Sequence, residues 1–194
     1  VKKRGDTHKL IEEFMLLANK YVSKFITTKQ EQKNGEGKSI CVYRIHDKPD
    51  PDRMHDLDLY IRGLGYTVRF MDGLIPSKDL NDLLIKMGER PEKALLQMHI
   101  TRAMAKAIYS TKNVGHYGLA FDFYSHFTSP IRRYPDVLTH RLLMRVLSDD
   151  YPREEERGKY DRLCLLASRR EKEASDAERG SIKYKQVEYM SYRI

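Results

Sequence analysis

The chain has 194 residues, of which a third are charged, and Lys and Arg exceed Asp and Glu by eight. This length fits one domain or a large part of one, no apolar run is long enough to span a membrane, and the positive excess favours polyanionic partners such as nucleic acid. The two cysteines, Cys41 and Cys164, lie far apart outside any CxxC motif. This usage excludes a disulfide framework and is typical of free thiols in a reducing cytoplasm.

The first part of the chain predicts a helix, a loop and a strand. Apolar residues recur at helical spacing from about Thr7 to Ile26, which predicts an amphipathic helix. Residues 27–38 are polar and glycine-containing and predict a loop, and the alternating residues 39–45 predict a strand. The apolar positions of the helix are Leu10, Ile11, Phe14, Leu17, Ala18, Tyr21, Val22 and Phe25.

Aspartates crowd residues 46–58, but their spacing argues against a metal site. Asp50 followed by Pro51 is the typical start of a helix, with Asp50 as the N-cap. Asp56 and Asp58 are two residues apart, so they point to different sides of that helix. We therefore interpret these aspartates as capping and surface residues.

The middle of the chain predicts a short strand over residues 66–70, a helix from Ser77 to Met87 closed by the following glycine, and a longer helix from Pro91 to about Tyr109. Arg102 and Lys106 are four residues apart and share one face of the last helix. They are either a solvated pair or part of a path for nucleic acid.

The stretch from Gly115 to Leu143 is the richest in functional side chains. Ser129 followed by Pro130 predicts a helix start, because serine caps a free amide and proline at the first position has none to satisfy. Arg132 and Arg133 then fall in the first turn, where the helix dipole disfavours cations and attracts anions. Two guanidinium groups beside free amides suit a phosphate. The alternative is that they pair with distant carboxylates.

Two further helices are predicted after this stretch, over residues 136–147 and from Lys159 to about Glu188, with a charged connector over residues 149–158. Residues 119–127 predict another strand. The fold class is therefore predicted as α+β, predominantly helical with a few antiparallel strands.

Four sequence motifs resemble one family. They are Ile-Glu-Glu-Phe-Met-Leu-Leu-Ala-Asn at 11–19, His-Tyr-Gly-Leu-Ala at 116–120, Tyr-Ser-His-Phe-Thr-Ser-Pro-Ile-Arg-Arg-Tyr-Pro-Asp at 124–136, and Thr-His-Arg-Leu-Leu at 139–143. In this order they resemble the RNase II/RNase R family of RNB-domain exoribonucleases, and within it the bacterial RNase R branch. Ser-Arg-Arg at 168–170 and Ala-Glu-Arg at 177–179 resemble the last helix of that catalytic domain.

The resemblance implies a partial RNB catalytic domain. Residues 1–190 resemble its C-terminal half, and residues 191–194 resemble the start of the linker to a C-terminal OB-fold RNA-binding domain. The family binds Mg²⁺ through a DPxxxxDxDD-type aspartate cluster, which this sequence lacks. We therefore expect no metal ligand in this chain and Mg²⁺ in the full-length enzyme.

The resemblance also implies roles for individual residues. Arg132 is expected to clamp the scissile phosphate, and Glu178 lies where some members carry an acidic residue near the active site. Glu13, rather than Glu12, is expected to contact a ribose 2′-hydroxyl, with favourable charge at a helix N-terminus as the alternative. The residues expected to bind RNA are Arg133, Tyr134, Ser129, Thr128, His116, Tyr117, His126, Glu13 and Asn19.

The predicted function is that of part of a processive 3′→5′ hydrolytic exoribonuclease, which degrades single-stranded RNA to nucleoside 5′-monophosphates in the cytoplasm. The expected partners are single-stranded RNA and the ribosome or the RNA-decay machinery, with no membrane. We expect this chain alone to be inactive and to expose apolar surface through which it self-associates. The alternatives are a non-catalytic helical RNA-binding module and a scaffold without a role in nucleic-acid binding.

Overall fold

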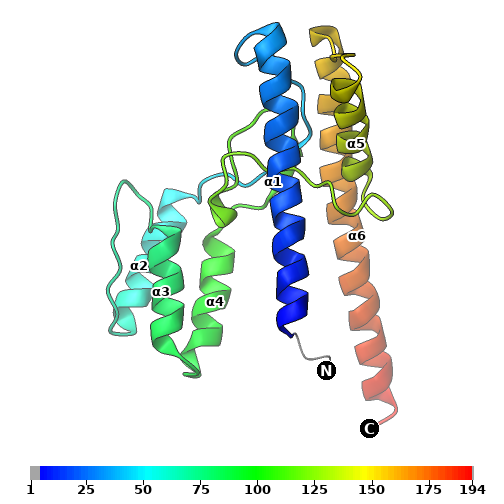
Figure 1. The fold of residues 1–194 in the computed structure, drawn as a ribbon. Helices are drawn as coiled ribbons and strands as arrows, with labels where there is room; N and C mark the ends of the chain where they lie inside the picture. The colour runs from blue at the N-terminus through cyan, green and yellow to red at the C-terminus, as the bar shows by residue number, and fades with distance from the viewer. Residues whose placement is uncertain (1–4, 194) are drawn as a thin grey trace. The chain divides into compact units, whose positions relative to one another are not determined.

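The computed structural model describes residues 5–193, and about 63% of it is helical. The predicted fold class is confirmed, because helices dominate the structure (Figure 1). One antiparallel pair of strands accompanies them. The elements in chain order are α1 (Asp6–Asn34), β1 (Tyr43–Ile45), α2 (Pro51–Gly63), α3 (Ser77–Met87), α4 (Glu92–Ala103), β2 (Ile108–Ser110), the 3₁₀ helix η1 (Tyr117–Leu119), α5 (Tyr134–Leu147), the 3₁₀ helix η2 (Glu154–Glu156) and α6 (Arg157–Ser191).

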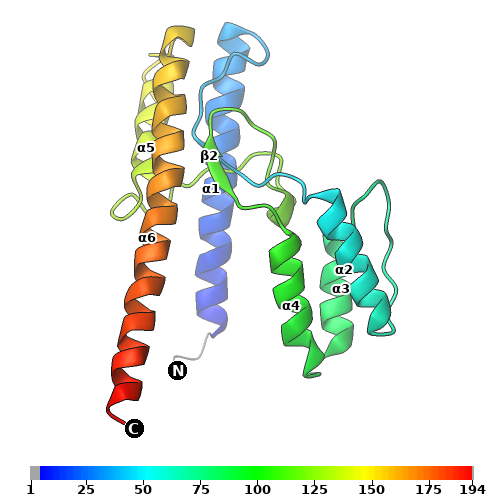
Figure 2. The same cartoon turned by 180° about the vertical axis from the view of Figure 1, so that it is seen from behind.

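The chain folds as two compact units. Unit 1 is the described part of residues 1–44, 108–113 and 124–194, and unit 2 is residues 45–107 and 114–123. In unit 1, α1, α5 and α6 run alongside one another (Figures 1 and 2), with α5 packed against both of the others and β2 packed against α6.

Helix α1 buries its polar side. The side chain of Gln30 is fully buried, and its amide group both donates to the carbonyl of Ile40 and accepts from the N–H of Ile40, at 2.9 Å each. The hydroxyl of Thr27 lies 2.6 Å from that of Tyr43. These tertiary hydrogen bonds hold residues 27–34 in the helix, so the predicted loop is wrong there. The apolar side of this helix, which includes Phe14, is exposed.

In unit 2, helices α2, α3 and α4 surround an apolar core. The predicted start of α2 at Asp50 and the predicted end of α3 before Gly88 are confirmed, whereas the N-cap of α3 is Pro76 and no side chain caps it. The carboxylate of Asp50 accepts from the N–H groups of Asp52 and Arg53, so Asp50 caps α2 as predicted. Gly88 ends α3 with a φ of 59°, which glycine adopts at no steric cost. The core consists of Met54, Leu57, Ile61, Ile75, Leu80, Leu83, Met87, Leu96 and Ala103.

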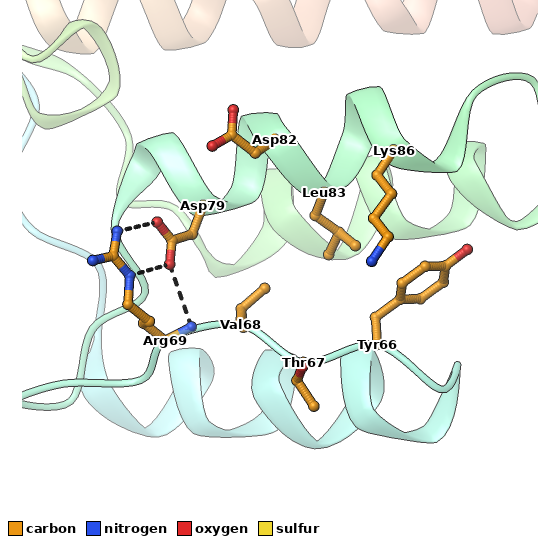
Figure 3. Close-up of a pocket in the computed structure, with 8 residues that line it drawn as sticks. All are labelled: Tyr66, Thr67, Val68, Arg69, Asp79, Asp82, Leu83 and Lys86. Carbon is orange, nitrogen blue, oxygen red and sulfur yellow. Dashed lines mark hydrogen bonds and ion pairs between the residues drawn. The ribbon is translucent and has the colours of Figure 1, made fainter.

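The extended segment 66–70 faces α3 without forming a strand (Figure 3). The guanidinium group of Arg69 donates to both carboxylate oxygens of Asp79, at 2.7 and 2.8 Å, and its backbone N–H donates to the same carboxylate at 3.3 Å. Hydrogen bonding from Arg69 lowers the pKa of Asp79. The backbone here bonds to a side chain instead of a neighbouring strand, so the strand prediction is wrong.

Three other predicted boundaries are wrong for similar reasons. Helix α4 ends at Ala103 instead of near Tyr109, because the N–H of Tyr109 donates to the hydroxyl of Ser168, at 2.9 Å, from within strand β2. Only the last three residues of 39–45 form a strand. Residues 119–127 make isolated contacts, such as the bond from the N–H of Arg44 to the carbonyl of Tyr124 at 2.8 Å, and form no strand.

Candidate functional site

The residues before α5 form a turn of their own. The N–H groups of Arg132 and Arg133 both donate to the carbonyl of Ser129, at 3.3 and 3.1 Å. Arg133 is extended, with φ −127° and ψ 117°, and acts as the N-cap of α5, which begins at Tyr134. The extended backbone separates the turn from the helix, so the predicted helix start at Ser129 and Pro130 is wrong. The two arginines flank the positive end of α5 from outside.

A buried carboxylate organises this turn. Asp136 is fully buried, and its Oδ1 accepts from the N–H of Ser129 and from Nη2 of Arg133, at 2.8 Å each. The side chain of Arg133 is 21% exposed. Arg133 is thus ion-paired, although its carboxylate is three residues away and not distant as the alternative expected. The sequence analysis did not single out Asp136, although an acidic residue in the first turn of a helix is favoured by the helix dipole.

Arg132, unlike Arg133, does not bond to Asp136. Its side chain is exposed, and within residues 5–193 no carboxylate pairs with it. It borders a pocket of about 570 Å³ in unit 1, formed by the turn, the start of α5 and one face of α6. The charged or hydroxyl-bearing residues that line this pocket include Arg132, Arg133, Tyr134, Arg170, Glu171 and Glu178. Arg132 and Glu178 thus line the same pocket, and their catalytic roles stay predictions.

A network at the side of this pocket neutralises one of its carboxylates. Arg44 donates to both oxygens of Glu171, at 2.6 and 3.0 Å, and its guanidinium group lies 4.6 Å from the centre of the Tyr109 ring. Burial raises the pKa of Tyr109 to about 12, so its hydroxyl stays protonated at neutral pH. Because Glu171 is already paired, the positive groups of the pocket keep their attraction for an anion.

The positive charge of the chain is concentrated in unit 1. The described residues of this unit contain 23 of the 36 Lys and Arg residues and 17 of the 28 Asp and Glu residues, whereas unit 2 contains 10 and 11. A basic surface attracts a polyanion by long-range electrostatics. The Arg132 pocket therefore lies in the part of the chain that is suited to nucleic acid.

Sequence comparison connects this site to a known family, since the RNB domain matches residues 1–149. The chain belongs to the RNB-domain family. It is similar to ribonuclease R of Thermotoga maritima, with 37% identity over 100% of this chain and 27% of that protein. It is also similar to ribonuclease R of Aquifex aeolicus, with 37% identity over 98% of this chain and 26% of that protein. The chain thus spans about a quarter of the length of these relatives.

Solved structures share the RNB fold of this chain. The apo form of Mycoplasma genitalium RNase R has a TM-score of 0.86 and 23% identity over 100% of this chain and 30% of its own. The same protein in complex with ribose-methylated single-stranded RNA has a TM-score of 0.80 and 24% identity over 94% and 28%. Yeast Ssd1, a pseudonuclease, has a TM-score of 0.65 and 24% identity over 86% and 20%. These likenesses establish the fold.

Three other residues predicted to bind RNA belong to the scaffold of unit 1. The side-chain amide of Asn19, which is buried, accepts from the N–H of Phe127 at 2.9 Å and donates to the hydroxyl of Tyr124 at 3.2 Å. Nδ1 of His126 bonds to the hydroxyl of Tyr109 at 2.8 Å. The hydroxyl of Thr128 is buried. Their contacts with RNA stay predictions, and within the protein they hold the segment that leads into the turn.

His116 and Tyr117 belong to unit 2, whereas the residues of the Arg132 pocket belong to unit 1. The hydroxyl of Tyr117 donates to the carbonyl of Ile75 at 2.8 Å, and Nδ1 of His116 accepts from the N–H of Leu119 at 3.2 Å. Glu13 is exposed on α1. The RNA contacts predicted for these three residues are not tested by the geometry.

A second pocket, of about 450 Å³, lies in unit 2 beside α3 (Figure 3). Its arginine, Arg69, is held by Asp79, and Asp82 and Lys86 add charges of opposite sign. Its charges are balanced, so it is a poorer phosphate site than the Arg132 pocket.

The described residues contain no group of three or more His, Cys, Asp or Glu side chains that could hold a metal ion. The described residues therefore do not form a metal centre by themselves. Nor does any helix among residues 5–193 combine the length and apolarity that a membrane crossing requires.

Proposed function

We propose that this chain is part of an RNase R-like 3′→5′ exoribonuclease that hydrolyses single-stranded RNA processively to nucleoside 5′-monophosphates. In this proposal the chain supplies the arginine that clamps the phosphate and part of the RNA channel. The observation that carries the proposal is the exposed Arg132, which borders the same pocket as Glu178 in the basic unit of an RNB-family chain.

The geometry of the turn supports a clamp at Arg132. A guanidinium group binds a phosphate through two parallel hydrogen bonds, which requires a fixed approach. The bonds from Ser129 and Arg133 to the buried Asp136 fix the turn on both sides of Arg132. A preorganised cation stabilises the charge that develops on the phosphate in the transition state without reorganisation during the reaction.

A divalent metal is the remaining requirement. RNB-domain nucleases are generally dependent on divalent metals, and we propose that the metal here is Mg²⁺. Mg²⁺ prefers carboxylate oxygens and retained waters, and it stabilises charge during phosphodiester hydrolysis when bound. Because the described residues offer no suitable cluster, we propose that its ligands belong to a part of the full-length enzyme outside these 194 residues.

Kinetics of the full-length enzyme test this proposal. With Mg²⁺ and 3′-tailed RNA, Arg132→Ala should lower kcat by on the order of a hundredfold or more and change KM modestly, because the contact strengthens in the transition state. Arg141→Ala is the matched control, since Arg141 is exposed on α5 and does not line the pocket. Equal rates for Arg132→Ala and the control would refute the clamp.

The second candidate is a non-catalytic RNA-binding module. It is favoured by the fold shared with Ssd1, a pseudonuclease. The same full-length assay separates the two candidates, because binding of RNA without release of mononucleotides would support the module. A scaffold with no role in nucleic-acid binding predicts no binding of single-stranded RNA even at low salt, where electrostatic binding is strongest.

We also propose that residues 1–190 belong to the C-terminal half of the catalytic domain. Residues 191–194 would then begin the linker to an OB-fold domain, and residue 194 lies outside the described residues. The proposed location is the cytoplasm, with the ribosome or the RNA-decay machinery as protein partners. Affinity capture of the full-length protein from cell extracts, with and without RNase treatment, tests these partners.

The exposed apolar side of α1 indicates a docking surface. Leu10, Phe14 and Tyr21 are 56%, 62% and 61% exposed. Large contiguous apolar surface is rare on monomeric proteins and marks interaction sites. We propose that this side docks the remainder of the catalytic domain and that the 194-residue chain, produced alone, self-associates through it.

Light scattering after size-exclusion chromatography tests the self-association. Phe14→Glu should shift the chain toward the monomer, because a charge in a buried apolar contact is costly. Ile85→Glu is the control, since Ile85 is 76% exposed on α3 in unit 2. A monomeric wild-type chain, or an equal shift in both variants, would contradict the proposal.

A further inference from the structure

A second arginine borders the Arg132 pocket from a different element. Arg132 comes from the turn before α5, and Arg170 comes from α6. The pocket, of about 570 Å³, therefore has arginines on two of its walls. Neither sequence motif nor family resemblance assigned a role to Arg170.

The present partner of Arg170 is weakly bound and shared. Nη1 of Arg170 lies 2.7 Å from Oε2 of Glu173, and the two side chains are 72% and 41% exposed. Exposed ion pairs contribute little to stability. Glu173 also accepts from Nε of Arg169 at 2.8 Å. If Arg170 turned to another anion, Arg169 would still satisfy the carboxylate.

The α6 face of the pocket leaves room for a nucleic-acid backbone. Arg170, Ala174 and Glu178 lie at intervals of four residues, so they share one face of the helix. The distance along the axis from Arg170 to Glu178 is about 12 Å at 1.5 Å per residue. Between the two charged side chains, the small Ala174 and Ser175 line the pocket. A strand that reaches Arg132 can therefore approach the helix closely.

We propose that Arg170 binds a second phosphate of the RNA strand, next to the phosphate that Arg132 holds, and gives up Glu173 when it does so. The inference rests on the proposed function, because it takes single-stranded RNA as the ligand, and it deepens that function by assigning a further RNA-binding residue. Arg169 takes no part, since it does not line the pocket.

Arg169 is a closely matched control. It is adjacent to Arg170 on the same helix, has the same charge, is 77% exposed and pairs with the same carboxylate. Any effect of net charge or of losing a bond to Glu173 should appear in both variants. Only a contact inside the pocket distinguishes them.

The experiment measures binding of fluorescein-labelled oligouridine to the 194-residue chain by fluorescence anisotropy at several salt concentrations. Each phosphate contact with a single strand contributes about 0.7 to the slope of log K against log salt. Arg170→Ala should weaken binding several-fold and reduce the slope by about 0.7, whereas Arg169→Ala should retain most of the wild-type slope. Arg170→Lys should keep the slope and bind with intermediate affinity, because lysine keeps the charge but not the two-pronged geometry.

The outcomes separate this inference from the function on which it rests. If the wild-type chain does not bind at low salt, the proposed grip on RNA fails. If the wild type binds and Arg132→Ala weakens binding, but Arg170→Ala equals Arg169→Ala, the role of Arg170 is refuted. Circular dichroism of each variant checks folding. If Arg170→Ala unfolds, Arg170→Lys decides the question. Two-pronged binding at Arg170 would be refuted if Arg169→Ala kept the wild-type affinity and slope and Arg170→Lys also bound with wild-type affinity.

Discussion

Replacement of Asp136 by alanine should destabilise unit 1 strongly. The carboxylate of Asp136 is fully buried and accepts from the N–H of Ser129 and from the guanidinium group of Arg133, at 2.8 Å each. Without it, both donors lose their partner, and the side chain of Arg133 is only 21% exposed. A buried donor left without an acceptor loses its hydration as well as its hydrogen bond.

The magnitude follows from these contacts. A hydrogen bond to a charged group contributes roughly 1.5–3 kcal/mol, and breaking a buried ion pair costs about 3–5 kcal/mol. We expect the free energy of unfolding to fall by about 3–5 kcal/mol in Asp136→Ala. Asp136→Asn should lose less, because both bonds go to one oxygen, Oδ1, which an amide oxygen can replace as the acceptor, so that mainly the charge that attracts Arg133 is lost. Domains have a total stability of only about 5–15 kcal/mol.

Urea denaturation followed by circular dichroism measures the change, and amide hydrogen exchange of α5 localises it. The control is Asp52→Ala, since Asp52 is an exposed acidic residue in the first turn of α2 and should contribute only its interaction with the helix dipole, about 0.3–1 kcal/mol. A loss below about 1 kcal/mol for Asp136→Ala would refute the view that this carboxylate organises the turn.

Three further outcomes are expected. Gln30→Ala should lower the free energy of unfolding by about 2–4 kcal/mol, because it leaves the buried N–H and C=O of Ile40 unpaired. In the same urea experiment, the control Gln32→Ala, on the exposed side of α1, should have little effect. Arg145 lowers the pKa of Glu156 from 4.5 to about 2. The ion pair therefore stabilises the fold at neutral pH, and this stabilisation is lost as the pH falls from about 4.5 towards 2. The difference in the free energy of unfolding between the wild type and Glu156→Gln should be about 1 kcal/mol or less at pH 7 and should shrink across that range. Burial raises the pKa of the Cys41 thiol to about 11, so a thiol reagent at pH 8 should label it only after unfolding, and rapid labelling of the native chain would contradict its burial.

Local interactions made some elements predictable. The start of α2 depends on Asp50 and Pro51, which are adjacent to the amides that they affect. The end of α3 depends on the conformational freedom of Gly88. The choice of Arg132 and Glu178 came from the order of motifs, and the structure places both at one pocket. None of these required knowledge of what packs against the element.

The outcome for α1 could not be read from periodicity. Its spacing of apolar residues correctly predicts a helix, but periodicity reports only that a helix has an apolar side, and not whether anything covers that side. In these 194 residues, the buried side carries Asn19, Thr27 and Gln30, each with a hydrogen-bond partner distant in the sequence. The same partners extend the helix beyond its apolar pattern.

The sequence by itself determined where most helices lie and which arginines deserved attention, because caps, proline, glycine and apolar spacing act over a few residues. Only the tertiary structure decided that Arg133 is held by the buried Asp136 while Arg132 faces a pocket completed by α6. Two adjacent side chains of the same type differ only in what surrounds them. Asp136 lies only three residues from Arg133, whereas α6, which completes the pocket beside Arg132, is far away in the chain, and no local pattern encodes its position there.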